Sequence, residues 1–99
     1  MYAIRYGESL PDEFADLRAK DRTRILYAID VQLLHEPNRQ SRNRKLLEGL
    51  VPPWEHAGPT WELRVGEYRV FYDLDETEKV VNVRAIRHKP PHKTTDEVL

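Results

Sequence analysis

The chain has 99 residues, of which 39% are hydrophobic and 33% are charged. This length fits one hydrophobic core, so we expect a single domain over residues 1–99, with more charge than the average of about 25%. The absence of cysteine excludes disulfides, thiolate catalysis and cysteine zinc sites, and no stretch resembles a transmembrane segment or a signal peptide. We therefore expect a cytoplasmic protein.

The net charge of -1 conceals an uneven distribution along the chain. Acidic residues concentrate in the first third and at residues 73–78, whereas residues 39–45 and 79–93 carry basic charges and no acidic ones. Basic clusters of this kind bind polyanions, although each run alone is equally compatible with a solvated surface.

The first predicted elements are a strand and two helices. An alternating segment at residues 2–6 predicts the strand, Ser9 and Pro11 mark the start of a short helix, and Asp21 begins a second helix that Pro37 ends. Because almost no loop separates the helices, they should form an antiparallel hairpin that covers a sheet. Their apolar stripes are Leu10, Phe14 and Leu17, then Ile25, Ile29 and Leu33.

The second half of the chain predicts the sheet. Residues 38–60 are irregular, with a basic segment that could be helical up to Leu50 and then a proline-rich loop. Alternating apolar and polar residues predict strands at 61–65, 68–74 and 79–86. The expected fold is α+β: an N-terminal strand and a two-helix hairpin packed on one face of an antiparallel sheet of about four strands.

Two turns fix the expected register. Gly66-Glu67 predicts a type II′ hairpin that places Arg64 opposite Arg69, and a symmetric turn centred on Glu76-Thr77 would place Arg84 opposite Arg69. The expected helix-facing set is Trp61, Leu63, Val65, Tyr68, Val70, Tyr72, Val81, Val83 and Ala85. The opposite face would carry Glu62, Arg64, Arg69, Phe71, Asn82, Arg84 and His88.

Three arginines in one row form an unfavourable arrangement. Like charges directly opposite on paired strands cost up to about 1 kcal/mol, and a bound anion would relieve the repulsion. Arginine suits forked contacts with phosphate, and Phe71 beside the row offers a plane for an unstacked base. Alternatively, Glu62 neutralises the arginines and Phe71 is covered, which would leave an ordinary solvated face.

The segment after the last strand adds histidines to this face. The prolines within residues 87–93 impose an extended path beside the sheet, and the side chains there could close over a ligand. His88 shares the parity of the arginine row and is a candidate for proton transfer. His88 and His92 could instead bind a metal, but they lack an aligning helix and an acid between them, so we expect no metal and no cofactor.

The hairpin from Trp61 to Tyr72, the basic segment before it and the closing Ile86-Arg87-His88-Lys89 occur in an order and spacing that resembles the RelE/ParE superfamily of toxins from type II toxin-antitoxin systems. The resemblance covers nearly the whole chain. It implies a toxin, of the kind that stabilises plasmids, bound by a small antitoxin in a hetero-oligomer. RelE-like members cleave mRNA on the ribosome without metal and so inhibit translation, whereas ParE-like members poison DNA gyrase.

We favour the RelE-like interpretation, an mRNA endoribonuclease, over a gyrase inhibitor or a non-catalytic, degenerate RNA-binding module. By this resemblance Arg64 and Arg69 would stabilise the phosphorane, Arg84 and Lys89 would support them, and His88 or Glu62 would transfer protons. The sequence departs from the family where Glu62 replaces an often basic residue, and where the tail tyrosine of many members is missing. The expected RNA-binding residues are Arg84, Phe71, Arg87, Lys93, Lys45 and Arg44.

Overall fold

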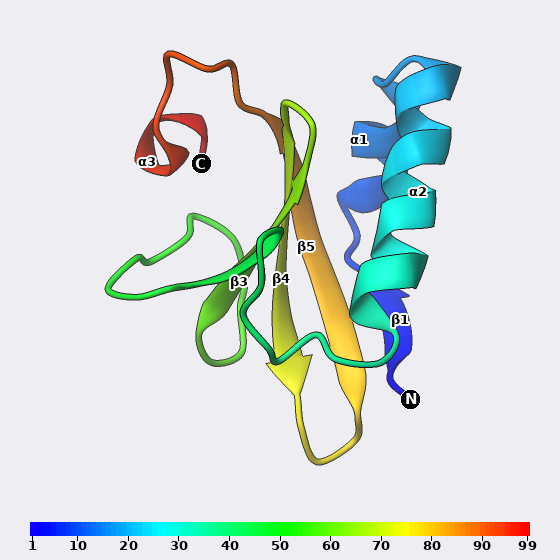
Figure 1. Cartoon of the computed structure of the whole chain (residues 1–99), viewed down its shortest axis with the longest axis vertical. Helices are drawn as coiled ribbons and strands as arrows, with labels where there is room; N and C mark the ends of the chain where they lie inside the picture. Colours follow the sequence, from blue (N-terminus) through cyan, green and yellow to red (C-terminus); the bar gives the residue numbers. More distant parts are fainter.

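The structure, a computed structural model, describes residues 1–99. Figure 1 shows α1 and α2 on one side of the sheet and α3, with the C terminus, on the other. The predicted α+β architecture with a helical hairpin on one face is confirmed. In chain order the elements are β1 (Ala3–Tyr6), α1 (Leu10–Ala15), α2 (Ala19–Leu33), β2 (Arg44–Leu47), β3 (Thr60–Val65), β4 (Tyr68–Asp75), β5 (Val80–His88) and α3 (Thr95–Val98).

The sheet has five strands in the order β1-β5-β4-β3-β2, with β1 parallel to β5 and the other neighbours antiparallel. The fifth strand is β2, which comes from the basic segment that we expected to be helical. That expectation was wrong. Pairing with β3 buries Leu47 and packs Leu46 against the core. A helix of basic residues would not bury these two adjacent leucines.

The main core lies between the sheet and the helical hairpin. The predicted helix stripes are confirmed, since Leu10, Ile25, Ile29 and Leu33 are fully buried against strand residues such as Val70. Burying one such side chain contributes about 1.5 to 3 kcal/mol. These contacts fix the sheet's helix-facing side, which leaves the opposite side to carry the polar site.

The first predicted hairpin is confirmed in every pair. Arg64 lies opposite Arg69, and Val65 lies opposite Tyr68. Gly66 has φ +59, the left-handed conformation that glycine adopts without a steric penalty. An added Cβ there would also lie 2.8 Å from the Arg24 guanidinium, but that flexible side chain can move away, so the positive φ is what requires glycine.

The predicted register of β4 with β5 was wrong for two reasons. The connecting turn is centred one residue further along the chain, so Leu74 rather than Tyr72 pairs with Val81, and β5 carries a β-bulge. Tyr72 pairs with Val83 but the preceding Phe71 pairs with Ala85, so Arg84 is left without an opposite residue. An extra residue reverses the alternation of side chains beyond it. Consequently Ile86 joins the main core, while Ala85 packs with Phe71 on the other face.

The C-terminal segment forms an unpredicted single helical turn, α3. Thr94 caps it by donating from its backbone N and from Oγ1 to Glu97 Oε1, at 2.9 and 3.0 Å. These two hydrogen bonds lower the pKa of the Glu97 carboxyl, so it is ionised at neutral pH. Leu99 packs against the small cluster of Leu47, Phe71 and Ala85, which holds α3 on the sheet's polar side. No helix has the length and apolar character needed to cross a membrane.

Candidate functional site

A row of three arginines does cross the polar face, but its third member differs from the prediction. Arg64 on β3 lies opposite Arg69 on β4, which lies opposite Arg87 on β5. Arg87 takes the place expected for Arg84, because the position of the turn moves the pairing by two residues and the bulge moves it by one more.

Arg69 is the most firmly held cation of the row. Only 7% of it is exposed, and Nη1 donates 2.9 Å hydrogen bonds to the carbonyl oxygens of Gly66 and Tyr68. Nε lies 3.3 Å from Glu62 Oε1, an ion-pair distance, but its N–H is not aligned for a hydrogen bond. Neither Nε nor Nη2 has an aligned hydrogen-bond acceptor, and Nε is buried against the Glu62 carboxylate.

Glu62 lies beside Arg69 and is 8% exposed. Its Oε1 faces Arg69, and its Oε2 accepts a 2.8 Å hydrogen bond from the Thr95 hydroxyl. The alternative in which Glu62 neutralises an arginine of the row therefore holds for Arg69. It does not hold for Arg64, which is exposed and forms no ion pair.

Arg64, Arg69 and Lys89 line one hollow of about 280 Å³, together with Gly66, Glu67 and Pro91. Neither Arg64 nor Lys89 is paired with a carboxylate. Glu67 directs its carboxylate toward His88, with Oε2 3.3 Å from Nε2. The hollow therefore brings together three of the residues predicted to be catalytic, with Glu62 adjoining it, and presents two unpaired cations.

Two predicted RNA-binding arginines are instead engaged by carboxylates. Arg84 forms a two-pronged pair with Asp73, with Nε–Oδ2 at 2.8 Å and Nη2–Oδ1 at 3.2 Å. Arg87 Nη1 lies 3.0 Å from Glu13 Oε1, and its guanidinium stacks on the Trp54 ring at 5.3 Å. The expectation that Arg84 belongs to an uncovered arginine row was wrong, because the bulge displaces it and Asp73 binds it.

Phe71 and His88 also lie elsewhere than predicted. Phe71 is fully buried, with its ring 5.3 Å from that of Trp54, so it offers no open plane for a base. His88 pairs with Tyr68 on the helix-facing side, and their rings lie 5.3 Å apart. The predicted place of His88 on the arginine face was wrong because it lies beyond the bulge. No three His, Asp or Glu side chains lie close enough together to hold a metal ion.

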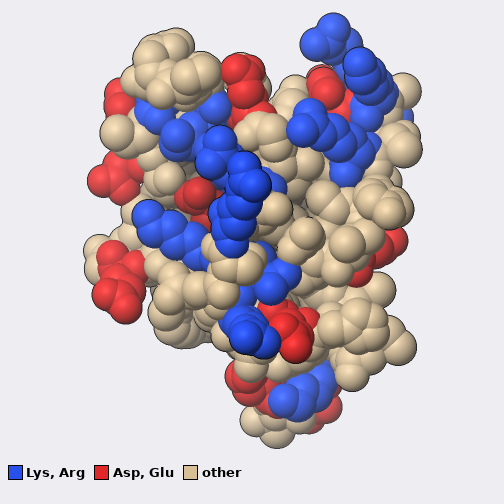
Figure 2. All heavy atoms as spheres, in the orientation of Figure 1, with Lys and Arg blue, Asp and Glu red and all other residues tan.

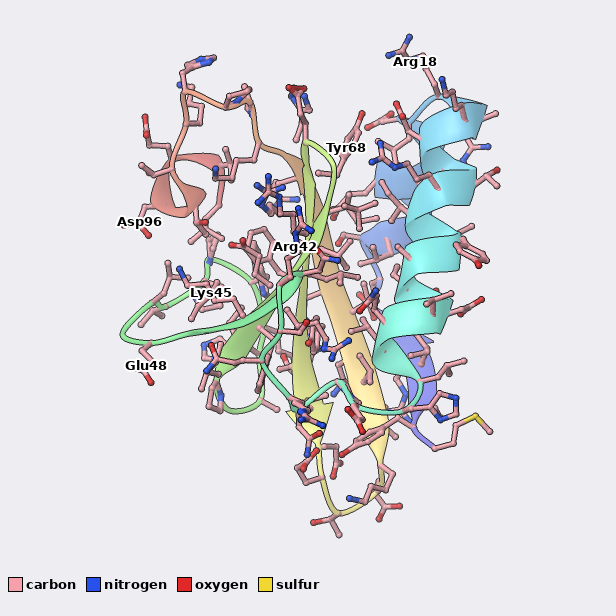
Figure 3. All side chains as sticks on the ribbon, viewed as in Figure 1. Arg18, Arg42, Lys45, Glu48, Tyr68 and Asp96 are labelled. Carbon is pink, nitrogen blue, oxygen red and sulfur yellow. The ribbon has the colours of Figure 1, made fainter.

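Of the remaining predicted RNA-binding residues, Arg44 faces the helix side of the sheet, opposite Leu63, whereas Lys45 shares the polar face with Glu62. Arg44 is tied to the end of α2, since Nη1 donates to Gln32 Oε1 at 2.6 Å, so its predicted contact with RNA lacks an open side chain. Lys45 pairs with Glu62 across β2 and β3, is exposed, and shares a hollow of about 630 Å³ with Thr95 and Asp96. Figure 3 shows Lys45 and Asp96 on the same side of the molecule. Lys93 is exposed before α3.

Lysine and arginine side chains gather over this part of the surface. Figure 2 shows them in a band across the strands, running from the C-terminal segment toward β2. The exposed Arg42, which forms no ion pair, lies in front of the sheet beside Lys45 in Figure 3. The chain is nearly neutral overall, but this face carries several cations without a carboxylate partner, and Figure 2 shows a second group of basic side chains over α2.

Thr95 and the two carbonyl oxygens that hold Arg69 were missed from the sequence. Carbonyl contacts leave no trace in residue identities. Thr95 did have a signal, because Thr94 and Glu97 have the spacing of a helix capping box and so predict a helical turn that begins at Thr95.

Residues 4–89 match the family model described as ParE toxin of type II toxin-antitoxin system, parDE. No curated protein matches the sequence. The fold is similar to that of an archaeal RelE-RelB complex from Pyrococcus horikoshii OT3, with 23% identity, a TM-score of 0.69, and coverage of 94% of this chain and 98% of that one.

Two further solved structures share this fold. The toxin-antitoxin complex RelBE2 from Mycobacterium tuberculosis matches with 24% identity and a TM-score of 0.65, covering 89% of this chain and 98% of that one. A mutant E. coli toxin RelE in complex with an antitoxin peptide matches with 18% identity and a TM-score of 0.51, covering 96% and 87%.

Proposed function

This chain belongs to the ParE toxin family of type II toxin-antitoxin systems, within the RelE/ParE superfamily, and we propose that it is a ribosome-dependent mRNA endoribonuclease. Its partner in the resting state is the cognate antitoxin, as the similarity to toxin-antitoxin complexes supports. Its target in the active state would be mRNA.

One observation carries this proposal: Arg69 is fixed by two carbonyl oxygens beside a hollow in which two further cations have no carboxylate partner. The cost of gathering like charges falls when an anion binds among them. Phosphate oxygens match arginine donors in charge and geometry. Arg64 and Lys89 line the same hollow, so an RNA phosphate seated there would meet three cations.

The proposed reaction is attack of a ribose 2′-hydroxyl on the adjacent phosphorus, with departure of the 5′-oxygen and formation of a 2′,3′-cyclic phosphate. Glu62 is the base that takes the hydroxyl proton, since it is the carboxylate adjoining Arg69. Arg64 and Arg69 stabilise the charge on the phosphorane. Lys89 returns a proton to the 5′-oxygen, because arginine cannot lose one under these conditions and His88 lies on the other face.

The surrounding surface suits a single strand of RNA. Lys45, Lys93 and Arg42 are exposed and form no ion pairs, and Figure 2 shows a band of basic side chains over this face. Backbone contacts of this kind give affinity without sequence information. Selection of codons would then depend on the ribosome rather than on an aromatic side chain of the toxin that stacks on an RNA base.

Arg64→Ala and Lys89→Ala are expected to lower mRNA cleavage by about 10² to 10³-fold each, since each removes one donor from the phosphorane. Arg64 is exposed and unpaired, so its loss should change stability by no more than about 0.5 kcal/mol. The measurement is primer extension on mRNA recovered from cell-free translation with purified toxin.

Lys20→Ala, which removes an exposed lysine from α2, is the matched control and should cleave like the wild type. If the wild-type toxin leaves mRNA intact on translating ribosomes, the nuclease proposal is rejected.

Gyrase inhibition is a second candidate, favoured by the match to the ParE family model and by the pairing of Arg84 and Arg87 with carboxylates. These pairs reduce the cation set that a nuclease could use. A gyrase inhibitor should stop DNA supercoiling in a purified assay and leave translation unaffected. Unchanged supercoiling at a large excess of toxin would exclude this candidate.

A further inference from the structure

Two of the residues proposed for catalysis, Glu62 and Arg69, are covered by the chain itself. Glu62 and Arg69 are 8% and 7% exposed although they lie on the sheet face that the α1-α2 hairpin leaves free. α3 lies on this side of the sheet, and its first residue, Thr95, donates a 2.8 Å hydrogen bond to Glu62 Oε2.

This contact, together with the 8% exposure of Glu62, closes the carboxylate off from a substrate. One carboxylate oxygen faces Arg69 at 3.3 Å and the other accepts from the Thr95 hydroxyl. A ribose hydroxyl needs one of these oxygens at hydrogen-bond distance before it can transfer a proton. The arrangement in the structure is therefore a resting one, and productive binding of RNA requires Thr95 to leave.

The attachment of α3 is suited to such a movement. The helix has four residues and none of them is buried, so it depends on the Thr94-Glu97 cap, the Thr95 contact and the packing of Leu99. A single helical turn is not stable by itself, and segments with few buried contacts open at small free-energy cost. Loss of one contact should thus release the segment.

We propose that Thr95 is a positioning residue that latches the C-terminal segment, residues 94–99, over Glu62 in the resting toxin and releases it when RNA enters. This inference rests on the proposed nuclease function for its catalytic consequence, but the latch itself is a property of the free toxin. The hollow of about 630 Å³ between Lys45 and residues 94–96 provides space beside the latch into which the segment can shift.

The test compares Thr95→Val, which keeps the shape and removes the donor, with Thr95→Ser, which keeps the donor. Hydrogen exchange of the full-length toxin, followed by mass spectrometry, reports opening directly. Thr95→Val should accelerate exchange in residues 94–99 by about tenfold, the effect of losing one hydrogen bond to a charged group, while Thr95→Ser should match the wild type. Exchange in the core peptide of α2 should be unchanged in both.

Cleavage in the translation assay separates the latch from the function it serves. A latch predicts that Thr95→Val cleaves mRNA faster than the wild type and that Thr95→Ser restores the wild-type rate. Faster exchange with no cleavage by any variant keeps the latch and rejects the nuclease. Unchanged exchange in Thr95→Val overturns the latch, and so does slower cleavage by that variant with a wild-type melting temperature.

Discussion

Replacing Asp73 with alanine is expected to destabilise the fold by about 3 kcal/mol or more, because the carboxylate is buried and charged partners depend on it. Asp73 is 1% exposed and accepts four hydrogen bonds, two from Arg84, one from Asn82 and one from the backbone N of Ala57. Its loss would leave those donors without an acceptor. Urea unfolding followed by circular dichroism measures the change.

Asp75→Ala is the matched control on the same strand. Asp75 accepts one hydrogen bond, from the backbone N of Glu78 at 3.0 Å, so its removal should cost about 1 kcal/mol. The double variant Asp73→Ala with Arg84→Ala should be less destabilised than the sum of the single variants, because no unpaired guanidinium remains. Equal losses for Asp73→Ala and Asp75→Ala would contradict the role of Asp73 as the centre of this network.

The hydrogen-bond network around Asp73 and Arg84 shows why the site could be predicted only in part. Gly66 fixes the β3-β4 register locally, so the opposition of Arg64 and Arg69 follows from counting along the sequence. The third arginine depends on a bulge that no glycine marks. One signal was available: Ala85 and Ile86 are adjacent apolar residues and break the alternation of β5, which indicates a change of face.

The sequence did not predict that Arg84 and Arg87 would pair with distant carboxylates. Glu13 lies on α1 and meets Arg87 from 74 residues away, while Asp73 meets Arg84 in a β4-β5 register that differs from the predicted one. Such contacts depend on tertiary packing rather than on local patterns. The helix stripes were predictable for the opposite reason, since their spacing alone defines one buried face.

Short elements were the other source of error. β2 has four residues, and its basic charge concealed the two leucines that favour its pairing with β3. α3 also has four residues, and its only sequence signal is the capping-box pattern of Thr94 and Glu97. Elements of this length are stabilised by tertiary contacts rather than by their own sequence, so sequence periodicity says little about where they form.

Arg69→Gln is expected to abolish mRNA cleavage and also to destabilise the toxin, and the two effects can be separated. Without the guanidinium, Glu62 remains as a buried carboxylate with no cationic partner, which costs about 3 to 5 kcal/mol. Cleavage should fall by about 10² to 10³-fold, because the forked donor to the phosphorane is lost. Urea unfolding and primer extension measure the two effects.

The double variant Glu62→Gln with Arg69→Gln separates catalysis from folding. It removes both charges, so most of the lost stability should return, since the cost of the single variant comes from one uncompensated charge. Cleavage should not return, because the base and the phosphate ligand are both absent. A double variant that regains stability and also cleaves mRNA would show that the pair has only a structural role. A double variant that fails to cleave mRNA but still halts supercoiling would identify gyrase as the target, since inhibition by binding does not need this pair.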